Sequence, residues 1–107
     1  MSTEDPAQSA AYAGGTASDI PIEPQSLEWM RRLVAIPSIS GTSNLGVIEL
    51  IEAEFARYGY TGQRTYNADQ TRANLWVTVP AADGSTEGGI VISGHTDVVP
   101  VEGQTWD

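Results

Sequence analysis

Two residues near the carboxyl end of the chain carry side chains that can do chemistry together. His95 is the single histidine among 107 residues, and Asp97 follows two positions later, in the run Ser-Gly-His-Thr-Asp-Val-Val-Pro at 93–100. Because side chains alternate along an extended chain, the imidazole and the carboxylate are expected to project to the same side. A carboxylate in that place accepts the imidazole N–H, fixes the tautomer and raises the basicity of the other ring nitrogen. The pattern is typical of a histidine metal ligand held by an acid.

The same pair has other interpretations. A histidine followed by threonine and aspartate is common in capped turns and solvated loops, and a His–Asp pair also occurs as part of a catalytic dyad. No nucleophile motif of the Gly-x-Ser-x-Gly kind accompanies the pair. One histidine and one aspartate do not complete an ordinary metal site either. The residues alone therefore leave open part of a metal site, a capped turn and a fragment of a dyad.

The composition excludes several other kinds of site. The absence of cysteine excludes disulfides, thiolate zinc sites and cysteine nucleophiles, and a single histidine excludes a self-contained site with two imidazoles. The net charge is -9, from 14 acids and 5 bases. Nucleic acids and anionic membranes are bound by clustered cations, so we expect neither as a partner. Without a stretch of about 20 apolar residues or the basic start of a signal peptide, the chain is expected to be cytoplasmic.

The helices that must position the pair are predicted from hydrophobic periodicity. A first helix is expected from Ser26, as its N-cap, until Pro37 stops it. A second helix is expected to start at Ser43 or Asn44 and to end at Gly59, which can take a positive φ without a Cβ penalty. The apolar stripe of the second helix consists of Val47, Ile48, Ile51, Phe55 and Tyr58.

Three strands are expected after the helices. A polar edge strand spans 61–66, and a stronger strand spans 74–79. The third is the β-branched run 90–92, whose lack of alternation predicts a strand covered on both faces. His95 then follows a buried strand, where α/β sheets usually open their sites. Two helices followed by about three strands of a mixed sheet predict an α/β fold. The inner face of the second strand is expected to carry Leu75, Val77 and Val79.

The start of the chain differs from the rest. Residues 1–24 carry four acids and no base and are rich in Ala, Ser, Thr, Gly and Pro. Their apolar residues are too few and too scattered to form a buried face. A disordered acidic arm is therefore expected at 1–24, and the foldable part at 25–107.

The run at 93–100, with its continuation Val-Glu-Gly-Gln-Thr-Trp at 101–106, resembles the first metal-binding signature of the acetylornithine deacetylase family. That family of dinuclear zinc amidohydrolases and peptidases also contains succinyl-diaminopimelate desuccinylases and glutamate carboxypeptidases. Leu-Val-Ala-Ile-Pro-Ser-Ile-Ser at 33–40 is similar to the helix end and loop that open the family's catalytic domain, and Asn74-Leu-Trp is similar to the strand before the signature. The resemblance covers 26–107, and its continuation favours the deacetylases within the family.

The resemblance implies a role for each member of the pair. His95 matches the family's first metal ligand, on one of two zinc or cobalt ions, and Asp97 matches the catalytic-site acid that orients this histidine. In the family a bridging aspartate, a glutamate general base and further ligands lie downstream, so this chain is expected to hold one ligand of a complete site. Glu102 and Asp107 are nearby acids, but both fall in an expected loop, where acids are usually solvated.

The resemblance also implies a fold and a reaction. Residues 25–107 would be the N-terminal portion, truncated, of a zinc-aminopeptidase-like catalytic domain. The complete enzyme would hydrolyse an N-acylated amino acid, releasing ornithine and acetate from N-acetylornithine in arginine biosynthesis, and would form a homodimer through a domain absent here. The chain alone is expected to be inactive. Two alternatives stay open: a desuccinylase, dipeptidase or carboxypeptidase of the same family, and a non-catalytic interaction module.

Overall fold

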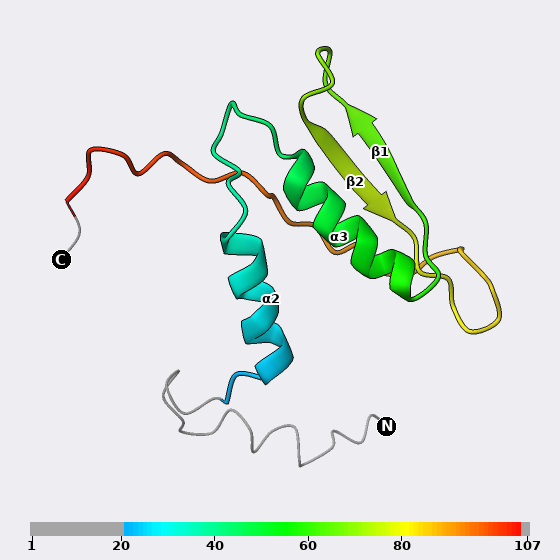
Figure 1. Cartoon of the computed structure of the whole chain (residues 1–107). Helices are drawn as coiled ribbons and strands as arrows, with labels where there is room; N and C mark the ends of the chain where they lie inside the picture. The colour runs from blue at the N-terminus through cyan, green and yellow to red at the C-terminus, as the bar shows by residue number, and fades with distance from the viewer. Residues whose placement is uncertain (1–20, 106–107) are drawn as a thin grey trace, which may run out of the picture. The chain divides into compact units, whose positions relative to one another are not determined.

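A computed structural model describes residues 21–105 of the chain. Its elements are helices α2 (Pro24–Val34) and α3 (Leu45–Arg57) and strands β1 (Gly62–Tyr66) and β2 (Ala73–Val77) (Figure 1). The chain divides into two units, Met1–Arg31 and Arg32–Asp107, and the His–Asp pair lies in the second. Most of the predicted acidic arm, 1–20, lies outside the described residues. Neither described helix combines the length and the apolar character that a membrane crossing requires.

Helix α2 begins earlier than its predicted N-cap. Pro24 occupies the first turn, where its missing N–H has no helical partner to lose. The Glu23 carboxylate accepts the Ser26 N–H at 3.0 Å, so the capping acceptor is the residue before the proline. The prediction of Ser26 as the N-cap is therefore wrong. The end of the helix at Val34, ahead of Pro37, agrees with the prediction.

Helix α3 confirms the prediction at both of its ends. Asn44 is the N-cap residue. Just past the other end, Gly59 has φ 85° and donates its N–H to the Ala56 carbonyl at 3.0 Å. Tyr60 donates its N–H to the Phe55 carbonyl at 3.1 Å. These two bonds form a Schellman motif, which requires a left-handed residue at the position that glycine occupies.

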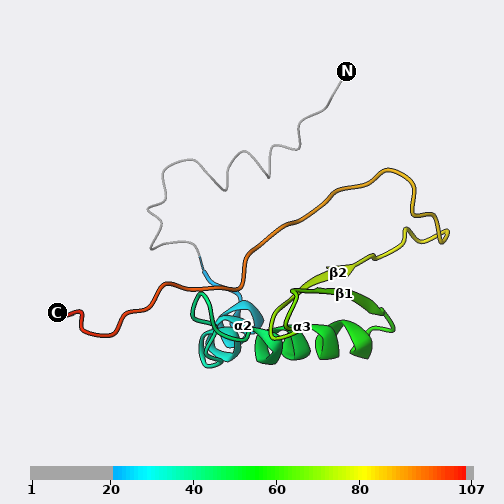
Figure 2. The ribbon, with the colours of Figure 1, turned by 90° about the horizontal axis from the view of Figure 1, so that it is seen from above.

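Strands β1 and β2 form an antiparallel hairpin that packs on α3, so that a helix layer faces a sheet layer (Figure 2). The register pairs Gly62 with Val77. Leu75 and Val77 lie on the inner face, as alternation predicts, and Trp76 is exposed on the other face. Val79 follows the end of the strand and is also exposed, so its predicted inward position is wrong. The buried apolar residues in the described part of the chain are Val47, Ile48 and Ala73.

The third predicted strand does not form within the described residues. Ile90, Val91 and Ile92 are 91%, 70% and 94% exposed, and the sheet has two antiparallel strands instead of about three mixed ones. The connection from β2 runs away from the hairpin before it reaches this run (Figure 2). A β-branched run has a high propensity for strand conformation, but its backbone N–H and C=O groups also need a neighbouring strand to bond with. No described element pairs with the run 90–92.

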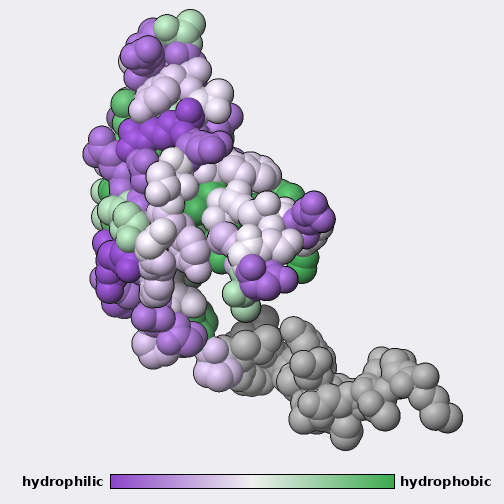
Figure 3. Space-filling model, turned by 90° about the vertical axis from the view of Figure 1, so that its right-hand side faces the viewer, coloured by the Kyte–Doolittle hydropathy of each residue, from purple (hydrophilic) through white to green (hydrophobic). Residues whose placement is uncertain are grey.

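Apolar side chains consequently reach the surface. Figure 3 shows hydrophobic side chains, in green, among polar ones on one face of the molecule. The coarse prediction of an α/β layer structure is confirmed by the packing of α3 on the hairpin. The larger mixed sheet is the part of that prediction which the described residues do not form.

Candidate functional site

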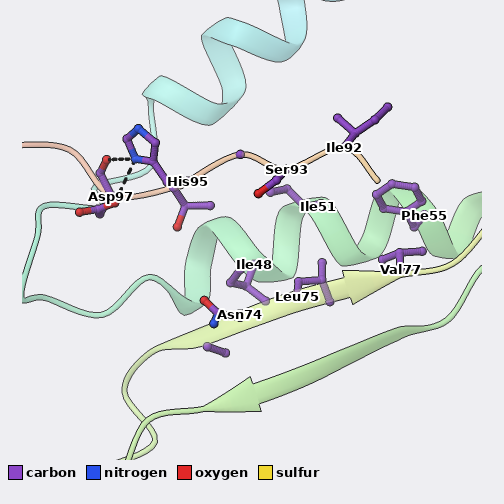
Figure 4. Close-up of a pocket in the computed structure, with 13 residues that line it drawn as sticks. Ile48, Ile51, Phe55, Asn74, Leu75, Val77, Ile92, Ser93, His95 and Asp97 are labelled. Atoms are coloured by element: carbon purple, nitrogen blue, oxygen red, sulfur yellow. Dashed lines mark hydrogen bonds and ion pairs between the residues drawn. The ribbon is translucent and has the colours of Figure 1, made fainter. Parts of the chain in front are cut away.

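His95 and Asp97 meet as the alternation predicts. The imidazole Nδ1 lies 3.0 Å from Asp97 Oδ1 and 3.0 Å from the Asp97 backbone oxygen. Both of those atoms are acceptors, so the geometry favours the tautomer that carries its proton on Nδ1 and leaves a lone pair on Nε2. Figure 4 shows the ring with its second nitrogen turned away from the carboxylate. No hydrogen bond from a described residue reaches that nitrogen.

The carboxylate of Asp97 has a second donor in Ser40. The Ser40 hydroxyl donates to Asp97 Oδ2 at 2.7 Å, while Oδ1 faces the imidazole. The hydrogen bonds from Ser40 and from His95 hold the pKa of Asp97 below its ordinary value, because each favours the charged form. Asp97 is therefore an anion at neutral pH with a partner on each oxygen.

A short parallel pairing attaches the His–Asp segment to the loop that follows α2. Ile39 and Val98 form an isolated parallel bridge. The Ser40 N–H donates to the Val98 carbonyl at 2.8 Å, and the Val98 N–H donates to the Ser38 carbonyl at 3.0 Å. Ser38 is buried, and its hydroxyl donates to the Thr96 carbonyl at 2.6 Å. The loop thus holds the backbone on both sides of the aspartate.

Asn44 joins the start of α3 to the hairpin and to the same segment. Its side-chain amide accepts the Ala73 N–H at 2.9 Å and donates to the Ala73 carbonyl at 2.9 Å. Its amide nitrogen also lies 3.3 Å from Thr96 Oγ1. The Asn44 amide therefore bonds to both backbone groups of the first residue of β2, as a residue of a neighbouring strand would. The two bonds between Asn44 and Ala73, together called the bracket, join the start of α3 to β2, and the contact with Thr96 adds the His–Asp segment.

Sequence reasoning found the pair but missed the residues that hold it. Ser40 lies 57 positions from Asp97, and Asn44 lies 52 positions from Thr96. The small polar residues that follow Pro37 are the signal in the sequence for such contacts. Contacts across such separations depend on how the elements pack, which periodicity does not reveal.

The described residues do not form a complete metal site. No group of three or more His, Asp or Glu side chains within 21–105 could hold one. Glu102 is exposed in a loop, as expected, and Asp107 lies outside the described residues. A neutral imidazole whose Nδ1 bonds to a carboxylate does match the chemistry of zinc and cobalt ligands. His95 and Asp97 therefore fit one corner of a metal site.

A groove of about 500 Å³ lies next to the pair. One wall comes from the apolar faces of α3 and β2, and the other from residues 92–97 (Figure 4). Its apolar lining consists of Ile48, Ile51, Phe55, Ala73, Leu75, Val77 and Ile92. The polar groups of His95 and Asp97 lie at one end of this groove, so a molecule that reached the imidazole would also meet apolar surface.

Several curated proteins are similar to the chain. The acetylornithine deacetylase of Erwinia tasmaniensis is 33% identical over 90 residues, which is 78% of this chain and 22% of that protein. The acetylornithine deacetylases of Salmonella arizonae and Salmonella agona are 31% identical over 90 residues and 32% identical over 92 residues. The chain thus spans 22–23% of the length of these relatives. No family model matches the chain, and no solved structure matches it significantly.

Proposed function

Because the chain is a relative of the acetylornithine deacetylases over 78% of its length, we propose that it forms the N-terminal part of the catalytic domain of a metal-dependent amidohydrolase. The complete protein would have a zinc-aminopeptidase-like fold and would convert N-acetylornithine and water into ornithine and acetate, a step of arginine biosynthesis. It would act in the cytoplasm on this small N-acylated amino acid and form a homodimer through a domain outside this chain. The names of the relatives support the class of reaction.

The observation that carries the proposal is the bond between His95 and Asp97. With Nδ1 directed at the carboxylate over 3.0 Å, Nε2 keeps its lone pair and faces away from the Asp97 carboxylate. His95 would hold a Zn²⁺ or Co²⁺ ion through Nε2, and Asp97 would fix the tautomer and direction of the ring. When bound, such an ion polarises a carbonyl and lowers the pKa of a water.

The same geometry supports the proposal that this chain is inactive on its own. One imidazole with its orienting acid leaves most positions around two ions unfilled, and no group of three or more His, Asp or Glu side chains among the described residues could fill them. We therefore expect purified residues 1–107 to show no hydrolysis of N-acetylornithine with added Zn²⁺ or Co²⁺. Metal-dependent turnover by this chain would contradict the one-ligand assignment.

The decisive experiment replaces His95 by alanine in the complete gene product that carries this segment. We expect the rate of N-acetylornithine hydrolysis to fall at least about 1000-fold, as for loss of a group on which the catalytic constellation depends. Bound metal, measured by elemental analysis, should fall by up to one ion per subunit. Asp97→Asn should weaken metal affinity about 10–100-fold, because a neutral amide replaces the charged acceptor of the ring N–H.

A matched control is Asp69→Asn, which makes the same chemical change in the exposed hairpin turn, where Asp69 bonds only to Asn67 and Thr71. Activity and metal content should stay at the level of the unmodified protein. A near-normal rate for His95→Ala would refute the assignment of His95 as a ligand.

A further inference from the structure

We infer that Ser40 is a positioning residue of the candidate site: through Asp97, its hydroxyl sets the tautomer and the direction of the His95 ring. The consequence for a metal ion rests on the proposed function. The orientation of the ring, by contrast, is a property of this chain with or without an ion. The packing around the pair is weak.

Packing does not hold the His–Asp pair in place. The side chain of His95 is 85% exposed and that of Asp97 is 59% exposed. Side chains this exposed change rotamers on the picosecond to nanosecond timescale unless specific bonds restrain them. The direction of the ring therefore depends on its hydrogen bonds to the Asp97 backbone oxygen and to the Asp97 carboxylate, and the carboxylate is the acceptor that can rotate.

A series of bonds leads from the ring to the backbone of a distant loop. Asp97 accepts His95 Nδ1 on one oxygen at 3.0 Å and the Ser40 hydroxyl on the other at 2.7 Å. With a donor on each side, rotation of the carboxylate would break at least one bond. Without Ser40, the carboxylate would keep only its bond to the ring and could rotate away from it. The ring would then retain one acceptor, the Asp97 backbone oxygen at 3.0 Å, in place of two.

Ser40 is itself anchored, which makes it a suitable fixed point. Its N–H donates to the Val98 carbonyl at 2.8 Å, one position beyond the aspartate that its side chain contacts. Its hydroxyl also lies 3.2 Å from that same carbonyl. A hydroxyl has one proton, and the shorter, charge-assisted bond to the carboxylate is the stronger of the two. The hydroxyl therefore serves the carboxylate first.

The neighbouring serine has a different task. Ser38 is buried and bonds only to backbone, at the Thr96 carbonyl. Ser38 thus holds the course of the chain, whereas Ser40 holds a functional side chain. Thr42 provides a comparison in the same loop, because its hydroxyl donates to the Ile39 carbonyl at 2.7 Å and does not contact the pair.

The test uses the fact that the chain has one histidine. Residues 1–107 are labelled with ¹⁵N-histidine, and long-range ¹H–¹⁵N spectra are recorded at a pH where imidazole is neutral. These spectra report the tautomer of His95, and with one histidine in the chain the signals need no assignment. We expect the Nδ1–H form to dominate in the unmodified chain. Ser40→Ala should reduce the ratio of the two tautomers by about fivefold, the effect of one net hydrogen bond. Ser40→Thr, which keeps the hydroxyl, should restore the ratio, and Thr42→Ala should leave it unchanged.

The outcomes separate a positioning role from a purely structural one. An unchanged tautomer ratio in Ser40→Ala, with the amide spectrum of α3 and the hairpin intact, would overturn the inference. Should that variant unfold, Ser40→Cys offers a nearly isosteric side chain with a weak donor. An unchanged ratio there would overturn the inference as well, and an intermediate ratio would support it.

The metal-related part is read out separately in the complete protein. Ser40→Ala should weaken Co²⁺ affinity about tenfold, as removal of an outer partner of a ligand does. If the complete protein binds no metal while the tautomer still responds to Ser40, the proposed function fails and the control of the ring by Ser40 stands. If the complete protein binds metal but the tautomer ratio does not change in Ser40→Ala, the proposed function stands and the control of the ring by Ser40 fails.

Discussion

Replacing the half-buried Asn44 by alanine should destabilise the fold, because two backbone groups of Ala73 would lose their partners. In an antiparallel hairpin, the non-hydrogen-bonded pairs direct their N–H and C=O groups away from the partner strand. Ala73 pairs with Tyr66 in the register, and its two backbone groups bond to Asn44 instead. Ala73 is 4% exposed, so these groups lie where water reaches them poorly.

The expected size follows from those two groups. A buried backbone group left without a partner costs about 1–3 kcal/mol, and the space opened by truncation lets water approach, which favours the lower end. Two groups together give about 2–3 kcal/mol. A domain of 60–100 residues loses about 4–8 °C in Tm per kcal/mol, so Asn44→Ala should lower Tm by about 10–20 °C.

The assay is thermal unfolding followed by circular dichroism, with Asn74→Ala as the matched control. Asn74 carries the same side chain one position further along β2, but it is exposed and none of its side-chain atoms bonds to a described residue. Its substitution should change stability by less than about 0.5 kcal/mol. Equal Tm values for the two variants would refute the account of the bracket.

Two further predictions concern the end of α3 and the site carboxylate. Gly59→Ala should cost about 1 kcal/mol in urea unfolding, because the residue has φ 85°, whereas Gly94→Ala, where no atom lies within 4 Å of the added methyl, should cost nothing measurable. The bonds from Ser40 and His95 lower the pKa of Asp97 in the folded chain below the ordinary value of 3.8, which it keeps in the unfolded chain. These bonds therefore contribute their full stability at pH values above 3.8. The contribution is lost as the pH falls through the lower pKa of the folded chain. A ¹³C titration of the Asp97 carboxyl should give a midpoint below 3.8, and a midpoint that Ser40→Ala does not raise would contradict this cause.

Features that depend on neighbours in sequence could be predicted. The Schellman motif at Gly59 needs only a helix end and a residue that tolerates positive φ, and both are visible in the sequence. The contact of His95 with Asp97 needs only an extended chain, because alternation brings side chains two positions apart to one side. In both cases the cause and the effect lie within a few residues.

Features that depend on distant partners could not be predicted. The run 90–92 has the composition of a buried strand, yet whether it becomes one is decided by what lies beside it, and no described element does. Ser40 and Asn44 read as ordinary loop and capping residues until the fold brings Asp97 and Ala73 to them. Ser26 shows a local limit too, because a proline with a preceding acid can start a helix earlier than a serine would.

The parallel bridge between Ile39 and Val98 has a consequence for the order in which the chain folds. Its contacts join residues 58 to 60 positions apart. Closing a flexible loop of that length costs on the order of 3–4 kcal/mol in chain entropy. The two backbone bonds and the serine hydroxyl bonds each return a net gain of about 0.5–1.5 kcal/mol, so gain and cost are of similar size.

Chain closure at the bridge is therefore close to balance, whereas α3 and the hairpin form from contacts that are near in sequence. The segment with His95 should dock last during folding and detach first during local opening, so the amide protons of Ser40 and Val98 should exchange with solvent ahead of those within α3. A ligand that binds only the docked segment would shift this balance by mass action. Binding of a ligand at the site and docking of the segment that carries His95 are therefore thermodynamically coupled.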